Sequence, residues 1–486
     1  MVNFQLIYKI IGSLLLLLGS LLTLCTCISF YYLEDDMMAF LISTVFTFSC
    51  GFILKFFGRK AGNNLSRRDA YLLVTLTWTI FSFFGMMPFL IGGYIDNVTD
   101  AFFETMSGFT TTGATIIDDV EWMPHAILFW RTQTQWIGAL GIVFFTIAIL
   151  PSMVGSGSVK VFAAEATGPI RAKMHPRLST TAKWIWSVYS ALTIGCIVSF
   201  YLAGMGVFDS INYAMTTTAT GGFAPHNDSA AFFHSPSIEY IAILFQFLAG
   251  INFTILYLAA FRFKIGNLFK NSEFKLYMFV VAAATAWIMY LLMSRNGYGL
   301  ERAFRSSLFQ VVSFITTTGL FNDDPSRWPH ITWVILGGLM FLGACAGSTT
   351  GGFKCIRGVM VMKVLRNEFH KLLHPIAVLP VKINGLPVPQ QKLNSLLAFF
   401  AIFTLMVFLS ATIMIVAGID NTNAITIALS CISNVGPTLG TQIGPEMSWS
   451  LLPDYIKWIC TFLMLVGRLE IMSVLVLFTR GFWKDN

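Results

Sequence analysis

A short motif of threonines followed by glycine recurs along the chain, and its residue types could bind a monovalent cation. The first three copies are Thr110-Thr111-Thr112-Gly113, Thr218-Ala219-Thr220-Gly221 and Thr316-Thr317-Thr318-Gly319. A fourth, weaker copy reads Ser433-Asn434-Val435-Gly436. The copies recur at intervals of roughly a hundred residues, which is typical of a duplicated unit. The motif therefore divides the chain into four related units.

The chemistry of this motif suits an ion pathway. A dehydrated cation needs oxygen ligands in place of its hydration shell, and backbone carbonyls supply them without adding formal charge. Carbonyls that point the same way in succession require unusual backbone angles, which glycine tolerates. A short helix ending at the motif directs the negative end of its dipole toward the ion. Alternatively, threonine and glycine only allow close helix packing, but this explains one copy better than four.

Composition places the motifs in a membrane protein. Of the 486 residues, 56% are hydrophobic and 11% are charged, whereas soluble domains have roughly 25% charged residues. Apolar runs of about 20 residues, long enough to cross a bilayer, recur from end to end. Alternating ten-residue strands are not seen, so the spans are predicted to be helices. The predicted fold class is an all-α polytopic membrane protein.

Charged residues alternate between loops and predict the orientation of the chain. Lys and Arg dominate segments 55–68, 160–183, 262–275 and 354–371, which the positive-inside rule places in the cytoplasm. Acidic residues dominate most of the intervening segments, and 96–121 has acids but no Lys or Arg. All four motifs therefore fall on the outer side, where acidic side chains would concentrate cations. For any single acidic residue, its outer position is explained equally well by membrane insertion, which leaves acidic residues outside.

The apolar runs surround each motif in the same order: a spanning helix, a half-helix, the extended motif and a returning helix. A leading hairpin has runs at 10–30 and 37–57. The spans of the units are expected at 71–95 and 126–150, 184–202 and 238–261, 276–293 and a run from 331, and 396–417 and 456–478. The half-helices are expected at 100–109, 209–215, 301–314 and 420–432. This predicts ten spanning helices and four half-helices around one pseudo-tetrameric pore.

The domain boundaries follow from this order. Residues 1–60 form the hairpin, and the pore units are 61–160, 161–270, 271–375 and 376–486. Between 375 and 392 the chain has four prolines, which exclude a spanning helix and indicate a cytoplasmic connector.

The return run of the third unit contains a glycine-rich stretch, 343–352. Ten residues with four glycines and no large side chain do not form a rigid helix. We interpret the stretch as a flexible gate loop, and the alternative is a close-packing glycine patch. The candidate gate residues are Gly343, Gly347, Ser348, Thr349, Thr350, Gly351 and Gly352.

Arg468 lies inside the last apolar run. An arginine at that depth should face a cavity or a partner carboxylate. One hypothesis is a positive charge that faces the pore beneath the motifs and acts as an electrostatic barrier, released on activation. The other is a structural salt bridge to another helix. Glu470 is a poor partner on an ideal helix, because it lies about 200° around the axis from Arg468.

Other function classes have little support in the sequence. The eight cysteines (25, 27, 50, 196, 345, 355, 431 and 460) lack metal-ligand spacing with histidines and are expected to be small buried hydrophobic residues. A nucleophile–base pair at membrane depth is not seen, so an enzyme is not indicated. No cofactor is expected besides the permeating cation, and the partner is the lipid bilayer rather than nucleic acid.

The four unequal helix–pore-helix–helix units with single-glycine motifs resemble the Trk/Ktr/HKT superfamily of potassium transporters. The leading hairpin and the length resemble its TrkH/TrkG branch. The resemblance implies potassium uptake through a pseudo-tetrameric pore, in a homodimer that binds a cytosolic nucleotide-binding regulatory subunit of the TrkA type in the bacterial inner membrane. The implied ion-binding residues are Thr111, Thr112 and Gly113, then Ala219, Thr220 and Gly221, then Thr317, Thr318 and Gly319, then Asn434, Val435 and Gly436.

Two departures from a potassium-channel filter bear on selectivity. Each motif has one filter glycine where potassium channels have Gly-Tyr-Gly, and the fourth copy has Asn434-Val435 followed by Pro437. We therefore expect loose discrimination between potassium and sodium. A secondary active symporter that couples K⁺ to H⁺ or Na⁺ remains the alternative function, because only flux stoichiometry distinguishes the two.

Overall fold

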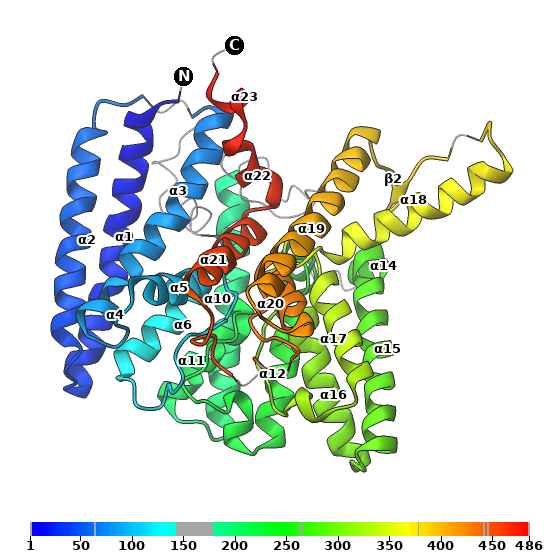
Figure 1. Ribbon diagram of the computed structural model, residues 1–486, viewed down its shortest axis with the longest axis horizontal. Helices are drawn as coiled ribbons and strands as arrows, with labels where there is room; N and C mark the ends of the chain where they lie inside the picture. The colour runs from blue at the N-terminus through cyan, green and yellow to red at the C-terminus, as the bar shows by residue number, and fades with distance from the viewer. Residues whose placement is uncertain are drawn as a thin grey trace.

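The computed structural model describes residues 2–62, 65–141, 178–261, 263, 266–377, 379–440, 443–444 and 447–484. The described chain is almost entirely helical (Figure 1). Its only strands are β1 (Lys382–Ile383) and β2 (Leu386–Pro387), which pair antiparallel. They lie within the proline-rich connector, which contains no spanning helix in its described residues.

Long helices alternate with short ones along the chain. The long helices are α1 (Phe4–Tyr32), α2 (Met37–Phe57), α3 (Arg67–Gly85), α10 (Leu178–Leu202), α15 (Ser272–Arg295), α18 (Cys355–Leu373) and α19 (Gln390–Val416). The short helices before the motifs are α5 (Val98–Phe109), α11 (Val207–Ala219), α16 (Leu300–Ile315) and α20 (Asn421–Ser433). The helices after the motifs are α6 (His125–Ala139), α12 (Pro236–Ala249), α17 (His330–Leu342) and α21 (Asp454–Arg468). The remaining helices are α4 (Met87–Ile91), α13 (Phe253–Phe261), α14 (Gly266–Lys270), α22 (Ile471–Leu475) and α23 (Arg480–Trp483), with 3-10 turns η2 (Ser229–Phe233), η3 (Pro325–Arg327) and η4 (Val476–Phe478).

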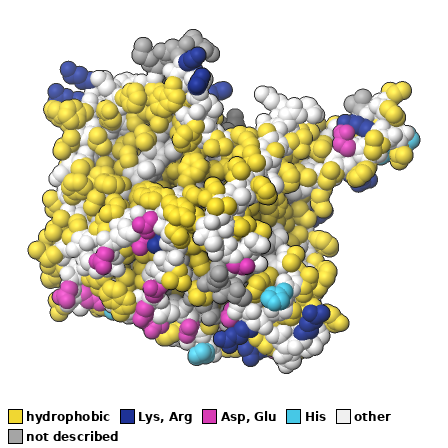
Figure 2. All heavy atoms as spheres, viewed as in Figure 1, with side chains coloured by type: hydrophobic (Ala, Val, Ile, Leu, Met, Phe, Trp, Pro, Cys, Tyr) yellow, Lys and Arg dark blue, Asp and Glu magenta, His cyan; other side chains and the backbone are white. Residues whose placement is uncertain are grey.

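The surface is that of a protein surrounded by lipid. Figure 2 shows hydrophobic side chains over most of the visible face, with acidic side chains gathered toward the lower side. Both chain termini lie at the upper side in the same view (Figure 1). Six helices are long and apolar enough to cross a membrane, and two further pairs of bent helices pass the same test together. The chain is therefore a multi-span helical membrane protein.

Two of the helices after the motifs, α12 and α21, are followed by sharp bends, which corrects the expectation of continuous return helices at 238–261 and 456–478. α12 and the helix after it are bent by 108°, and α21 and the segment 471–478 by 113°. Asn252 accepts a hydrogen bond from the amide of Thr254 and so begins a new helix. Glu470 has a φ of 64°, which a continuing helix does not allow. Apolar composition indicates burial and not the direction of the backbone, so the sequence pattern did not predict these breaks.

The predicted count of ten spanning helices is therefore too simple a description. Among the described residues, six stretches are long and apolar enough to cross a membrane as single pieces, and α18 is not one of them. α12 and α21 pass this test only together with the bent segments that follow them, and α17 is shorter. In the third unit, α17 and α18 are separated by the segment 343–354. The run expected at 126–150 gives α6, and its residues 142–150 lie outside the described part of the chain.

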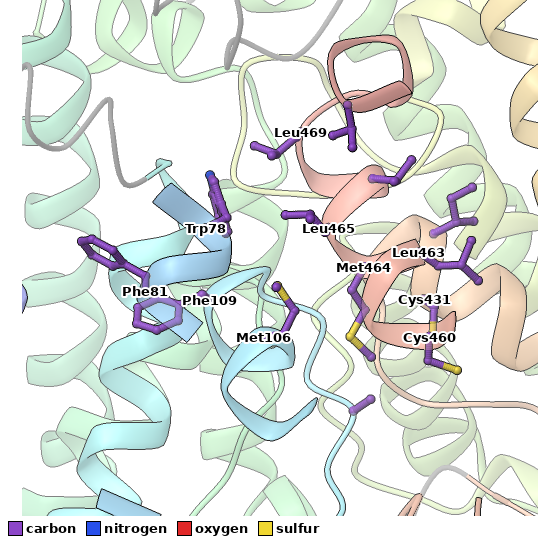
Figure 3. Packing of buried hydrophobic residues seen from close by; sticks show 14 of the residues in the cluster. Trp78, Phe81, Met106, Phe109, Cys431, Cys460, Leu463, Met464, Leu465 and Leu469 are labelled. Atoms are coloured by element: carbon purple, nitrogen blue, oxygen red, sulfur yellow. The ribbon is translucent and has the colours of Figure 1, made fainter. Parts of the chain in front are cut away.

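The short helix α5 packs in the middle of the protein between helices from both ends of the chain. The ring of Phe109 makes an edge-on contact with Phe81 of α3, with 5.6 Å between the ring centroids. Figure 3 shows these two rings together, and Cys431 of α20 beside Cys460 of α21.

Six of the eight cysteines are buried as expected, whereas Cys50 is half-buried and Cys27 is exposed.

Candidate functional site

The four short helices α5, α11, α16 and α20 end in the same backbone turn. Each is followed, directly or after one residue, by a non-glycine residue in the left-handed conformation, which is uncommon. These residues are Thr111, Thr220, Thr317 and Asn434, with φ of 53°, 53°, 55° and 55°. The next amide then donates to a carbonyl five residues back, from Thr112 to Ser107, from Gly221 to Thr216, from Thr318 to Ser313 and from Val435 to Ser430. This is the Schellman pattern of a helix C-terminus.

Two residues after each left-handed residue comes a glycine that also has a positive φ. These glycines are Gly113, Gly222, Gly319 and Gly436, with φ of 83°, 89°, 79° and 96°. The four equivalent segments are therefore 111–113, 220–222, 317–319 and 434–436. We call them the ring segments.

The second ring segment lies one residue later in the chain than the sequence predicted. Thr218 and Ala219 belong to α11, so the extended piece does not begin at Thr218. The equivalent of Gly113 is Gly222 rather than Gly221. The signal was present as the doublet Gly221-Gly222, but the run of threonines before it matched the motif in more than one alignment.

The ring segments close on one another in chain order. A methyl group on Gly113 would overlap the carbonyl oxygen of Gly221 in the second segment. A methyl group on Gly222 would meet the carbonyl of Thr318, one on Gly319 that of Val435, and one on Gly436 that of Thr112. Each contact joins the same two positions of successive segments. The four segments thus form a closed ring with approximate four-fold symmetry, in which only glycine fits at four positions.

The fourth segment differs in its side chains and still belongs to this ring. The Asn434 side chain donates to the Thr112 hydroxyl at 3.0 Å and to the carbonyl of Met464 at 2.9 Å. Asn434 therefore ties the last segment to the first and to α21. Asn434, which stands where the first and third copies have threonine, therefore helps to close the ring.

A cavity of about 100 Å³ lies on one side of the ring, and all four ring glycines line it. Asp118, His226 and Asn227 also line it. The Asn227 side chain donates to Asp119 at 2.7 Å, which lowers the pKa of that carboxyl group and favours its negative form. The lining thus includes the carboxyl group of Asp118, and Asp119 is next to it in the chain.

A buried ion pair supports the first ring segment from behind. Arg131 Nε lies 2.9 Å from a carboxylate oxygen of Glu104, and each side chain is 1% exposed. Glu104 also accepts from the amide of Ile116 at 3.0 Å, in the segment that follows the ring. Arg131 donates to the carbonyl of Ala224 at 3.2 Å, in the second unit. The pair joins α5 and α6 to both loops, and the sequence pattern indicated only that Glu104 was an acid near the motif.

The glycine-rich segment 343–354 lies against the ring on the side of the helix ends. The amide of Gly351 donates to the Thr317 hydroxyl at 2.7 Å, and a methyl group on Gly351 would overlap the carbonyl of Ser433. The Thr349 hydroxyl donates to the carbonyl of Thr218 at 3.2 Å. The segment therefore contacts the second, third and fourth units. We call residues 343–354 the intramembrane loop.

The other candidate gate residues shape this loop. Gly343, Gly347 and Gly352 have φ of 66°, 74° and 76°, where a larger residue would be strained. The Ser348 hydroxyl lies 2.8 Å from that of Thr350. These interactions fold the loop compactly between α17 and α18.

Arg468 holds the intramembrane loop to the first unit. Its guanidinium donates to the carbonyl of Thr349 at 2.8 Å and to that of Gly138 at 2.9 Å, and it also contacts the carbonyl of Ala139. The arginine is buried beside Thr350 and Gly351 in a small cavity. With this contact the loop is connected to all four units.

Three charged residues around the intramembrane loop were not identified from the sequence. One carboxylate oxygen of Glu273 accepts from the amides of Ala346 at 2.6 Å and Ile356 at 3.1 Å, near the two ends of the loop. The buried Lys354 ammonium contacts Thr350, and Arg357 pairs with Glu470 at the break after α21. Their signal was weak because Lys354 and Arg357 also belong to a basic segment typical of a cytoplasmic loop.

Comparisons with known proteins agree with this architecture. Residues 36–484 match the TrkH family, described as a cation transport protein. The chain is 34% identical to the Trk system potassium uptake protein TrkH of Salmonella typhimurium, over 99% of this chain and all of that protein. It is 33% identical to TrkG of Escherichia coli, over 94% of each chain. The crystal structure of the potassium transporter TrkH from Vibrio parahaemolyticus superposes with a TM-score of 0.88 at 34% identity, covering 99% of this chain and 100% of that one.

The buried pair gives a stability prediction. Glu104→Gln should lower the unfolding temperature in detergent, because removal of one partner from a buried ion pair costs about 3–5 kcal/mol. The double variant Glu104→Gln/Arg131→Met should be less damaged than either single variant, since it leaves no uncompensated charge.

Glu368→Gln is the matched control, because Glu368 belongs to an ion pair whose side chains are both substantially exposed. This variant should change the unfolding temperature little. Equal effects of Glu104→Gln and Glu368→Gln would contradict the assigned role of the buried pair.

Proposed function

This chain belongs to the TrkH family of cation transport proteins, and from that premise we propose that it takes up potassium through a channel-like pore formed by the four ring segments. The membership makes it a membrane transport protein of the Trk system rather than an enzyme. The observation that carries the proposal is the closed ring, in which four glycines with positive φ each contact the next segment.

The ring has the physical properties that a potassium site needs. Its segments follow the C-terminal ends of four helices, so the negative ends of four helix dipoles point toward it. Backbone carbonyls then offer oxygen ligands of moderate field strength, from which an ion can also leave. We propose that the ion is held by residues 111–113, 220–222, 317–319 and 434–436. Ala219 is not part of this proposed site, because it is the last residue of α11.

The four units around the ring would be 61–160, 161–270, 271–375 and 376–486, arranged as a pseudo-tetramer with the hairpin 1–60 outside it. In the proposed orientation, the cavity that Asp118 and the ring glycines line opens toward the outside of the cell. The intramembrane loop lies on the cytoplasmic side of the ring. This follows from the basic segments and the positive-inside rule. The membrane would be the inner membrane of a bacterium.

The intramembrane loop is the proposed gate. It lies against three of the ring units, and Arg468 joins it to the end of α6. A loop held in this way blocks the path below the ring and must be released before an ion can pass. Arg468 then has two effects: it fixes the loop by hydrogen bonds and places a positive charge near the path of a cation.

The assembly is proposed by resemblance to the family. The chain would form a homodimer and bind a cytosolic nucleotide-binding regulatory subunit of the TrkA type, which would control the gate. Figure 1 shows α18 extending away from the helical body. Its apolar residues Leu365, Phe369 and Leu372 are exposed in the isolated chain, which is compatible with a protein contact at this helix.

The alternative is a symporter that couples potassium to protons or sodium. Purified protein in liposomes distinguishes the two when the membrane potential and the gradients of K⁺, Na⁺ and H⁺ are set independently. A channel-like pore predicts a flux that follows the electrochemical gradient of potassium alone. A flux that requires a sodium or proton gradient would replace the channel proposal by the symporter.

The ring glycines give a prediction on selectivity. Gly222→Ser should reduce the preference for K⁺ over Na⁺ by about tenfold, because the new side chain would collide with the carbonyl of Thr318 and move a ligand of the ion. The measurement is the ratio of K⁺ and Na⁺ flux in liposomes.

Gly204→Ser is the matched control. Gly204 also has a positive φ, of 103°, but has nothing within 4 Å of an added methyl group. It therefore reproduces the backbone strain without the collision and should retain the selectivity. An unaltered flux ratio in a conducting Gly222→Ser protein would contradict the assignment of the ring.

The gate gives a second prediction. Arg468→Ala should raise the unstimulated potassium flux by about tenfold or more, since each lost charge-assisted hydrogen bond weakens the closed loop by about 1.5–3 kcal/mol. Arg468→Lys should give an intermediate flux, because it keeps the charge and loses the planar fork. The exposed Arg295→Ala is the control. Unchanged or lost flux in a well-folded Arg468→Ala protein would count against the gate.

A further inference from the structure

The ring segments differ in how they are fastened to their short helices. In the first unit, the hydroxyls of Thr110 and Thr112 lie 2.8 Å apart, and Thr110 also donates to the carbonyl of Met106. The third unit repeats this arrangement, with 2.7 Å between the hydroxyls of Thr316 and Thr318. We call this pair of hydroxyls the threonine clasp. It links the last turn of the short helix to the middle residue of the ring segment.

The second unit has no side chains that could form a threonine clasp. The shared hydrogen-bond pattern makes Ala219 and Gly221 the equivalents of Thr110 and Thr112. Neither residue has a hydroxyl group. The second ring segment therefore needs another support, because an extended segment without side-chain contacts could adopt several backbone arrangements.

Gln135 of α6 supplies that support from the first unit. Its amide nitrogen donates to the carbonyl of Gly221 at 2.7 Å. Its amide oxygen accepts from the Thr216 hydroxyl at 2.8 Å and from the amide of Phe223 at 3.1 Å. The side chain is fully buried. One glutamine thus binds the last turn of α11 and both sides of Gly222.

Gln135 also fills the space that a side chain at position 221 would need. A methyl group on Gly221 would overlap the terminal amide of Gln135. Gly221 is not among the glycines with positive φ, so its backbone does not require glycine. The reason for glycine here is steric: the amide of Gln135 lies where Thr112 and Thr318 carry their own side chains in the first and third units.

We infer that Gln135 is a positioning residue that replaces the threonine clasp of the second ring segment and thereby determines the selectivity of the ring. This inference rests on the proposed function. The hydrogen bond to Gly221 fixes the orientation of one ring carbonyl, and the bond from Phe223 fixes the chain just beyond Gly222. Without them the second segment can relax, and the four-fold arrangement of oxygen ligands loses one member.

The test compares K⁺ and Na⁺ flux through variants of the full chain in liposomes. Gln135→Ala should reduce the K⁺/Na⁺ flux ratio by about tenfold, the change that corresponds to loss of one to two hydrogen bonds. Gln135→Met should do the same while it keeps the volume of the side chain. Gln133→Ala is the matched control: Gln133 is buried in the same helix but contacts Cys25 of the hairpin, so its loss should leave the ratio unchanged.

A rescue experiment distinguishes a positioning role of Gln135 from a general effect of its loss on stability. Gly221→Thr alone should be damaging, because its side chain collides with Gln135. The triple variant Gln135→Ala/Ala219→Thr/Gly221→Thr rebuilds the threonine clasp in the second unit and should recover most of the selectivity. Recovery of the unfolding temperature without recovery of the flux ratio would overturn the inference.

Other outcomes are equally decisive. A selective wild-type protein with an equally selective Gln135→Ala or Gln135→Met variant would overturn the inference and leave the proposed function intact. A triple variant that does not fold would also count against it, because the clasp should substitute for the amide. A wild-type protein that conducts no potassium would instead refute the proposed function itself.

Discussion

Extended backbone at membrane depth is the constraint on which the rest of this structure depends. Such backbone must satisfy its polar groups within the protein or direct them into a polar cavity. Four segments meet this requirement together, because each is fastened to the end of a short helix and each glycine touches the carbonyl of the next segment. A side chain at any of these glycines would push two units apart. The closed ring is therefore a property of four units and not of any one of them.

The units reach the same backbone geometry by different side chains. The first and third use paired threonine hydroxyls, the second uses Gln135 from its neighbour, and the fourth uses Asn434, which donates across to Thr112. The surrounding charges are also distributed unequally, with the Glu104–Arg131 pair at the first two units and Arg468 between the first unit and the intramembrane loop. The four units thus share one backbone turn, and different side chains hold it in place.

The sequence predicted the backbone pattern better than the contacts that hold it. Four motifs between apolar runs predicted the half-helices, and the four glycines of 343–352 predicted the intramembrane loop, because glycine, threonine and helix length act locally. The displaced register at Gly222, the roles of Gln135 and Glu273, and the breaks at Asn252 and Glu470 depend on residues far apart in the chain. The pairing of Gly221 with Gln135 shows why: each residue is unremarkable by itself, and only their contact explains both.

The most direct test of the central claim is anomalous diffraction from crystals of the protein grown with rubidium in place of potassium. The account predicts an anomalous peak on the axis of the ring, enclosed by the segments that contain Gly113, Gly222, Gly319 and Gly436. The peak should weaken when an excess of potassium competes for the site. Rubidium bound only elsewhere in the protein, with no peak inside a well-ordered ring, would contradict the account.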